Sequence, residues 1–271
     1  MKNISSIKVE CINLFINFFG RFINEENYLK ILTFHDFDSD VDQYSVCKKN
    51  FLDYLSIIND EGYKTVSCME LFNNWNEYIF EKKILLTFDD GYSSHINFVM
   101  DKLLERRMKG VFFIITSVIS SRRKKKYFQN GIKEFLCFDD LVELNKNGLE
   151  IGSHSHTHTF FTKSPESEII KELGISKKIL EDTINSPVNW LSYPYGRGLE
   201  LSRKLSKIIS DSGYRLGFNN EGFSIKYCKN LLDIPRINVD YFDNEKTFRN
   251  KLNGKYNLIS LVRGNARKHR N

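Results

Sequence analysis

Short runs of β-branched and aromatic residues alternate along this chain with longer amphipathic stretches, and this alternation limits the possible folds more than any other feature of the sequence. The strand-like runs are Lys30 to Phe34, Ile84 to Phe88, Val111 to Ile115, Leu149 to Gly152, Trp190 to Tyr193, Tyr214 to Phe218 and Leu231 to Pro235. Helical patterns lie between most of them, near 46–59, 94–107, 139–146, 165–184 and 200–212. A βαβα order is typical of a parallel sheet, so we expect an α/β fold with about seven parallel strands.

The helical pattern at 165–184 has the clearest predicted start. Ser164 is a favoured N-cap residue, and Pro165 suits the first helical position. Glu166 and Glu168 then lie near the positive end of the helix dipole. We therefore expect this helix to begin at Pro165.

Length and composition favour one large domain. The chain has 271 residues, and α/β barrels of this size commonly form a single domain. Hydrophobic residues make up 41% and charged residues 27%, which is typical of a globular protein and excludes a disordered one.

The cysteines indicate a reducing compartment. Cys11, Cys47, Cys68, Cys137 and Cys228 are odd in number, scattered, and never form a CxxC pair. This pattern argues against a disulfide framework and against a cysteine metal site. We expect a cytoplasmic protein in which most of the cysteines are small core residues.

The net charge of +6 is concentrated in two places, the run Arg122 to Lys126 and the tail from Arg263 to Arg270. A nucleic-acid surface distributes its charge differently, so we expect no nucleic-acid partner. A solvated loop and a frayed basic end explain the two runs. Attraction of an anionic partner, such as a lipid diphosphate or acidic membrane lipid, stays open as the alternative.

Cys11 to Ile23 is the most apolar stretch, but it is too short to span a bilayer and contains Arg21. The region before it carries Glu10, and no cleavage site follows, so it does not resemble a signal peptide. Its aromatic residues recur at helical spacing. We expect an amphipathic helical segment over 1–28 that packs on the domain, with peripheral membrane contact, on the inner face, as the alternative.

Polar residues follow the predicted strands at the same end. They are His35-Asp36 after the first strand, Asp89-Asp90 after the second, His154 to His158 after the fourth, Pro194-Tyr195-Gly196 after the fifth and Arg236 after the last. In a (β/α) barrel the loops after the carboxyl ends of the strands converge on one mouth, which is where such folds keep their active sites. We therefore expect these residues to share one site.

The residues at this mouth have the chemistry of a catalytic metal site. Two imidazoles and one carboxylate give three ligands and leave a coordination position open for water, as in catalytic zinc sites. A second carboxylate beside the ligand can accept a proton from that water. Asp89 and Asp90 supply both carboxylates if the chain turns sharply after them, and Gly91 permits such a turn.

The motifs Thr87 to Gly91 (TFDDG), His154 to His158 (HSHTH) and Ser192 to Gly196 (SYPYG) resemble those of the polysaccharide deacetylases, also called NodB-homology or carbohydrate esterase family 4 proteins. The resemblance covers about Leu29 to Asp240. It implies a distorted (β/α) barrel, and we expect a catalytic domain over 29–262 followed by a basic tail over 263–271. It also implies metal-dependent removal of an N-acetyl group from an amino sugar.

The resemblance further implies roles for individual residues. Asp89 is the general base, Asp90, His154 and His158 bind the metal, and His156 is not a ligand. The backbone N–H of Tyr195, after Pro194, falls where the family binds the oxyanion. Zinc is the expected ion, and Co2+, Ni2+, Mn2+ or Fe2+ are alternatives for such ligands.

Two family features are missing. Ser192 and Tyr193 stand where many relatives have an arginine that orients the base, and Arg236 is the candidate to replace it. No late leucine-x-histidine motif is visible, and His269 in the tail is a poor substitute. We expect His35, which resembles a Tyr-His signature of biofilm poly-N-acetylglucosamine deacetylases, to serve as the general acid. We expect His95 to be a surface or capping residue.

The substrate is less constrained than the site. A cytoplasmic location favours an N-acetylated sugar in a nucleotide-linked, lipid-linked or oligosaccharide precursor of a surface glycan. Deformylation of a lipid-linked amino sugar is one alternative. A non-catalytic carbohydrate-binding relative is the other. The sequence leaves the oligomeric state open.

Overall fold

The computed structural model describes residues 28–37, 44–128, 131–196, 201–222, 225 and 228–256. The predictions for the helical segment at 1–28, apart from Tyr28, and for the tail at 263–271 lie outside these residues. Within the described ranges, no helix has the length and apolar character needed to cross a membrane.

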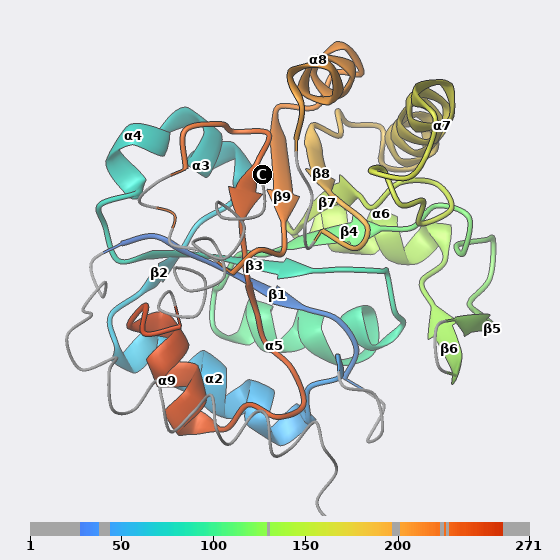
Figure 1. Cartoon of the computed structure of the whole chain (residues 1–271). Coiled ribbons are helices and arrows are strands. Elements are labelled where there is room, and N and C mark those ends of the chain that lie inside the picture. The colour runs from blue at the N-terminus through green and yellow to red at the C-terminus, as the bar shows by residue number, and fades with distance from the viewer. Residues whose placement is uncertain are drawn as a thin grey trace, which may run out of the picture.

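One parallel sheet forms the centre of the molecule (Figure 1). Its strands follow the order β10-β9-β8-β7-β4-β3-β1-β11, and β2 also pairs with β3. The bounds are Lys30–Phe34 for β1, Lys64–Thr65 for β2, Lys83–Phe88 for β3, Val111–Ile114 for β4, Glu150–Ser153 for β7, Trp190–Ser192 for β8, Leu216–Asn219 for β9, Ile234–Pro235 for β10 and Ile237–Asn238 for β11. The predicted parallel α/β fold is confirmed, and each of the seven predicted strands overlaps one of these.

The segment 234–238 closes the sheet into a nearly complete barrel. Ile234 pairs with Phe218 of β9 at one edge of the sheet, and Ile237 pairs with Leu32 of β1 at the other. Arg236 alone separates β10 from β11. This segment therefore brings the two edges of the sheet together and carries Arg236 between them.

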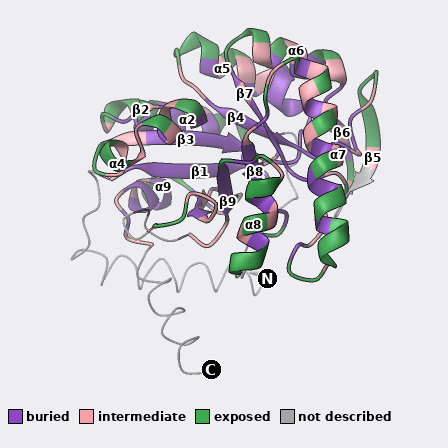
Figure 2. Cartoon of the chain, turned by 90° about the horizontal axis from the view of Figure 1, so that it is seen from above, coloured by how far each residue is buried: buried purple, intermediate pink, exposed green. Residues whose placement is uncertain are grey.

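Both faces of the sheet are buried, which explains the continuous apolar runs in the sequence. On β4, Val111 and Phe113 belong to one apolar cluster, while Phe112 and Ile114 belong to another. Figure 2 shows the buried strands surrounded by helices with exposed outer surfaces. The helices are α2 (Lys48–Asp60), α3 (Cys68–Asn73), α4 (Trp75–Tyr78), the π-helix η2 (His95–Val99), α5 (Met100–Glu105), α6 (Phe138–Lys146), α7 (Glu166–Ile184), α8 (Arg203–Asp211) and α9 (Glu245–Leu252).

The predicted start of α7 is wrong by one residue. Pro165 has an extended ψ of 148°, so it occupies the N-cap position and the helix begins at Glu166. The Pro165 carbonyl accepts a hydrogen bond from the Ile169 N–H at 3.1 Å, which starts the helical ladder. Ser164 therefore lies outside the cap.

The basic run at 122–126 is not a simple solvated loop. Lys124–Phe128 forms β5, which pairs antiparallel with β6 (Gly131–Phe135). Arg123 donates two hydrogen bonds to the carboxylate of Asp140 on α6, at 2.8 and 2.7 Å. Basic residues are poor strand signals, and strand pairing with β6 overrides their local preference.

Candidate active site

A pocket of about 350 Å³ lies at the carboxyl ends of the strands. Six of the residues that line it were predicted from the sequence: His35, Asp89, Asp90, His154, His158 and Tyr195. Four others complete the lining: Tyr44, Phe160, Asn220 and Asn238. The barrel thus brings together segments that are up to about 200 residues apart, as the rule for strand ends predicts.

Asp90, His154 and His158 form a compact set of ligand atoms. One atom from each residue lies within 4.8 Å of the other two. The Asp90 Oδ1 atom is 3.4 Å from His154 Nε2 and 3.7 Å from His158 Nε2. All three side chains are nearly inaccessible to solvent. Their type and spacing fit a divalent metal ion.

Burial keeps the two imidazoles in the form that binds metal. It lowers the pKa of His154, and it is the main cause that lowers the pKa of His158 to about 2. The His154 Nδ1 atom is 2.8 Å from the Ser192 carbonyl oxygen. A carbonyl only accepts, so Nδ1 carries the proton and Nε2 is available as a ligand.

Asp89 lies beside this set but has different partners. Its carboxylate is fully buried and accepts hydrogen bonds from Arg236 Nη1 at 2.8 Å and Nη2 at 2.7 Å. The Ser192 hydroxyl donates a third hydrogen bond at 3.1 Å. Burial alone raises the pKa of Asp89, but the charge of Arg236 outweighs it and holds the pKa well below its usual range. Asp89 is therefore ionised at neutral pH.

Arg236 is fully buried behind Asp89 and does not line the pocket. Besides its two bonds to Asp89, it donates to Thr87 Oγ1, Ser192 Oγ and the Asn219 carbonyl, at 3.0, 2.8 and 3.2 Å. These five hydrogen bonds match the five N–H groups of a guanidinium. Direct contact of Arg236 with a substrate does not fit this arrangement, whereas orientation of Asp89 does.

Backbone strain is concentrated at the site. Among the described residues, six other than glycine have a positive φ, and four of them belong to the predicted motifs. They are Asp90 at 76°, Ser155 at 63°, His158 at 64° and Tyr195 at 54°. Each such conformation costs about 1–3 kcal/mol and persists only where the surroundings impose it. The sharp turn expected at Gly91 thus begins one residue earlier, at Asp90.

Glu172 of α7 holds the strained histidine loop. Its buried carboxylate accepts hydrogen bonds from the backbone N–H groups of His156 and Thr157, at 2.9 and 2.7 Å, and from the Thr157 hydroxyl at 2.8 Å. The Ser155 hydroxyl accepts a further bond from the His158 N–H at 3.0 Å. Glu172 was not predicted as part of the site, although its position on the helix after the motif is a signal that it packs near the loop.

The other histidines have distinct positions. His35 lines the pocket, half-buried, with its ring 5.3 Å from that of Tyr44. His156 Nδ1 is 2.9 Å from Thr116 Oγ1, and His156 does not line the pocket. The prediction that His95 is a surface or capping residue is wrong. Its ring is fully buried among aromatic rings, and its Nε2 is 2.8 Å from the His35 carbonyl oxygen.

An aromatic pair borders the pocket beside His158. The Tyr195 ring lies 5.3 Å from that of Phe160 in a stacked arrangement and 4.5 Å from the His158 ring. Tyr195 is 52% exposed, whereas Pro194 before it is buried. Asn220 directly follows β9, and Asn238 is the last residue of β11. The rule that active-site residues follow the carboxyl ends of strands therefore applies to them as well.

Comparison with known proteins supports the same family. The profile of the family described as polysaccharide deacetylase matches residues 80–217, about half of the chain. YxkH of Bacillus subtilis (strain 168), which is named as a polysaccharide deacetylase, is 26% identical over 78% of this chain and 71% of its own length. A peptidoglycan-N-acetylglucosamine deacetylase of Bacillus cereus is 26% identical over 50% of this chain. The matched region covers 45% of that protein's length.

Solved structures share the fold. The deacetylase PplD of Streptococcus pyogenes, in complex with acetate, has a TM-score of 0.70 at 20% identity, over 83% of this chain and 98% of that chain. IcaB from Ammonifex degensii has a TM-score of 0.69 at 18% identity, over 84% of this chain and 97% of that chain. Both similarities agree with a distorted (β/α) barrel.

Proposed function

This chain belongs to the polysaccharide deacetylase family, and from that premise we propose that it removes an N-linked acetyl group from an amino sugar with the help of a divalent metal ion. The observation that carries the proposal is the different surroundings of two neighbouring carboxylates. Asp89 is held by Arg236, whereas Asp90 faces His154 and His158. One strand end thus supplies both a base and a metal ligand.

Asp90, His154 and His158 are the residues that hold the ion in this proposal. Two neutral imidazoles and one carboxylate suit zinc best, and Co2+, Ni2+, Mn2+ or Fe2+ are also compatible. When bound, such an ion polarises the amide carbonyl of the substrate and makes water more acidic. The remaining steps belong to side chains and backbone groups of this chain.

Asp89 accepts the proton of the attacking water. Arg236 and Ser192 fix the direction of its carboxylate, and the guanidinium keeps it ionised. The backbone N–H of Tyr195 is assigned to the oxyanion that develops on the carbonyl, and one such donor is worth about 3–4 kcal/mol. Pro194 and the positive φ of Tyr195 fix the direction of this peptide group.

His35 is assigned to the departing amine, to which it donates a proton. Its support is its place in the pocket, on the loop after β1. His35 is assigned this role because no histidine stands between His158 and His269 in the sequence. A His35→Gln variant is expected to lose activity while it retains the metal.

The proposed substrate is a polymer or oligosaccharide of N-acetylated amino sugar, or a lipid- or nucleotide-linked precursor of one. The names of the relatives, among them the peptidoglycan-N-acetylglucosamine deacetylase of Bacillus cereus, support the sugar class. Cys47, Cys68, Cys137 and Cys228 are all free thiols, which agrees with the proposed cytoplasmic location. Fractionation of cells that produce the chain tests that location.

Metal analysis combined with acyl release tests the function. The purified protein is expected to contain about one divalent ion and to release acetate from oligomers of N-acetylglucosamine. A chelator is expected to abolish release, and added zinc to restore it. Release of formate from a lipid-linked formylated sugar, without any acetate, favours a deformylase. Binding of sugar and metal without release of either acid refutes an enzymatic function.

A further inference from the structure

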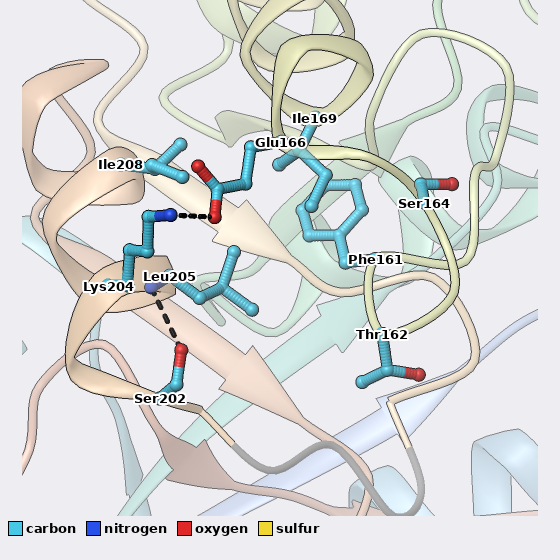
Figure 3. A pocket seen from close by; sticks show the side chains of 9 residues that line it. All are labelled: Phe161, Thr162, Ser164, Glu166, Ile169, Ser202, Lys204, Leu205 and Ile208. Carbon is cyan, nitrogen blue, oxygen red and sulfur yellow. Dashed lines mark hydrogen bonds and ion pairs between the residues drawn. The ribbon is translucent and has the colours of Figure 1, made fainter.

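A second cavity, of about 410 Å³, lies between the first turns of α7 and α8 (Figure 3). Phe161, Ile169, Leu205 and Ile208 provide its apolar surface. The first three of these side chains are at most 9% exposed. The size is in the range of ligand pockets, and these side chains belong to or pack against an apolar cluster of the core.

Polar groups line the rest of this cavity. Thr162, Ser164 and Ser202 also line it, and Figure 3 shows Thr162 and Ser164 across the cavity from Ser202. Lys204 and Glu166 form an ion pair of 2.5 Å between the two helices. The charges of this pair balance, so the lining favours an uncharged polar ligand over an ion.

The second cavity shares two loops with the catalytic pocket. The loop from β7 to α7 carries His158 and Phe160 in the catalytic pocket and then Phe161 and Thr162 in the second cavity. Consecutive Cα atoms are only about 3.8 Å apart, so Phe160 and Phe161 separate two neighbouring spaces.

The loop from β8 to α8 repeats this order. It begins at the catalytic pocket with Tyr195 and reaches the second cavity at Ser202, next to the first turn of α8. The stacked pair of Phe160 and Tyr195 joins the two loops at the catalytic end. Both spaces therefore lie on the face of the barrel that carries the site.

A sugar ring has the chemistry that such a lining recognises. Its hydroxyl groups pair with charged side chains such as Lys204 and Glu166, and its C–H faces pack on apolar surface. We propose that this cavity binds a distal sugar residue of an oligosaccharide whose N-acetylated residue lies in the catalytic pocket. The inference rests on the proposed function, because it concerns the length of the same substrate.

Two substitutions test the cavity, and a third is the control. Thr162→Trp fills it, and Lys204→Ala removes part of its polar lining. Lys207→Ala is the matched control, because Lys207 is also on α8 and is 75% exposed but pairs with Asp211, outside the cavity. Ser202 is unsuitable for substitution, because its hydroxyl caps α8 by accepting the Leu205 N–H.

Calorimetry with the metal-loaded Asp89→Asn protein measures binding apart from turnover. The probes are the hexamer and the dimer of β-linked N-acetylglucosamine. We expect the hexamer to bind at least tenfold more tightly than the dimer. Thr162→Trp and Lys204→Ala are each expected to reduce this ratio at least threefold, and Lys207→Ala to preserve it. Thermal unfolding checks that each variant is folded, and the exposed Lys204 variant suffices if the tryptophan is not tolerated.

Equal affinity for the two probes overturns the inference. A length preference that both cavity variants retain overturns it as well. The proposed function fails separately, if the wild-type protein releases no acetate from the hexamer. Length-dependent binding that is lost in the cavity variants supports the cavity even in that case.

Discussion

Asp89 and Asp90 are neighbours in the sequence, yet the two halves of the site to which they belong are held in different ways. The Asp89 half depends on charge and on closure of the barrel, because Arg236 reaches it from the segment that joins both edges of the sheet. The half with Asp90 and the histidines depends on strained turns that hydrogen bonds such as those to Glu172 hold in place. The base is thus oriented by a residue far away in the sequence, whereas the histidine ligands are oriented by residues near them in the sequence.

Ser192 belongs to both halves. Its hydroxyl donates to Asp89 and accepts from Arg236, while its carbonyl oxygen accepts the Nδ1 proton of His154. The first set of contacts requires the side chain, but the second requires only the backbone. The two halves therefore meet through different groups of Ser192, and His154 Nε2 also lies 3.9 Å from Asp89 Oδ2.

The largest effect is expected from Asp89→Asn. Loss of a general base reduces turnover about 10²–10⁴-fold, whereas metal affinity is expected to persist because Asp90, His154 and His158 remain. Acetate release and zinc titration measure the two properties. Asp139→Asn, an exposed change on α6, is the control. A variant that keeps a tenth of the activity contradicts the role of Asp89.

Arg236→Met is expected to have the next largest effect, a loss of stability. It leaves the buried Asp89 carboxylate without its counter-charge, and breaking a buried pair in this way costs about 3–5 kcal/mol in the free energy of unfolding. Denaturant unfolding measures this cost. Lys178→Met removes a surface ion pair and is expected to cost less than about 1 kcal/mol. Similar losses of unfolding free energy in both variants contradict the view that Arg236 holds Asp89 across the closed barrel.

Glu172→Gln is expected to lower metal affinity without disturbing the contacts of Asp89. Partners that orient metal ligands typically contribute about 10–100-fold to metal affinity, and the amide cannot accept all three hydrogen bonds as strongly as the carboxylate. Competition with a zinc indicator measures the affinity. Glu168→Gln, on the exposed side of the same helix, is the control. Unchanged zinc affinity rules out a positioning role for Glu172.

Thr157→Val is expected to give the smallest change. It removes the hydroxyl bond to Glu172 but keeps both backbone bonds, so the loss is about 0.5–1.5 kcal/mol, or a few-fold in metal affinity. The same indicator titration applies, with Thr183→Val near the far end of α7 as the control. A loss as large as that of Glu172→Gln indicates that the hydroxyl, and not the backbone, carries the interaction.

Much of the barrel and the site was predictable, because both depend on periodicity and on strand direction. The strand at Lys30 to Phe34 was predicted with the observed bounds, and Asp89, Asp90, His154 and His158 follow strands whose carboxyl ends meet. The pair of strands β5 and β6 was missed because the basic residues of β5 lack a strand pattern. His95 was misjudged because a polar residue near a helix start is usually exposed, whereas here it packs among aromatic rings.

The sequence by itself determined the alternation of the fold, the residue types of the site and their common end of the barrel. These are local properties, set by side-chain chemistry and by the direction of each strand. Sequence also proposed Arg236 as the partner of Asp89, but tertiary structure decided its paired hydrogen bonds, the place of Glu172 beneath the histidine loop, and the cavity between α7 and α8. Such pairings depend on how closely segments approach after the barrel closes, and burial then converts that proximity into fixed charge and geometry.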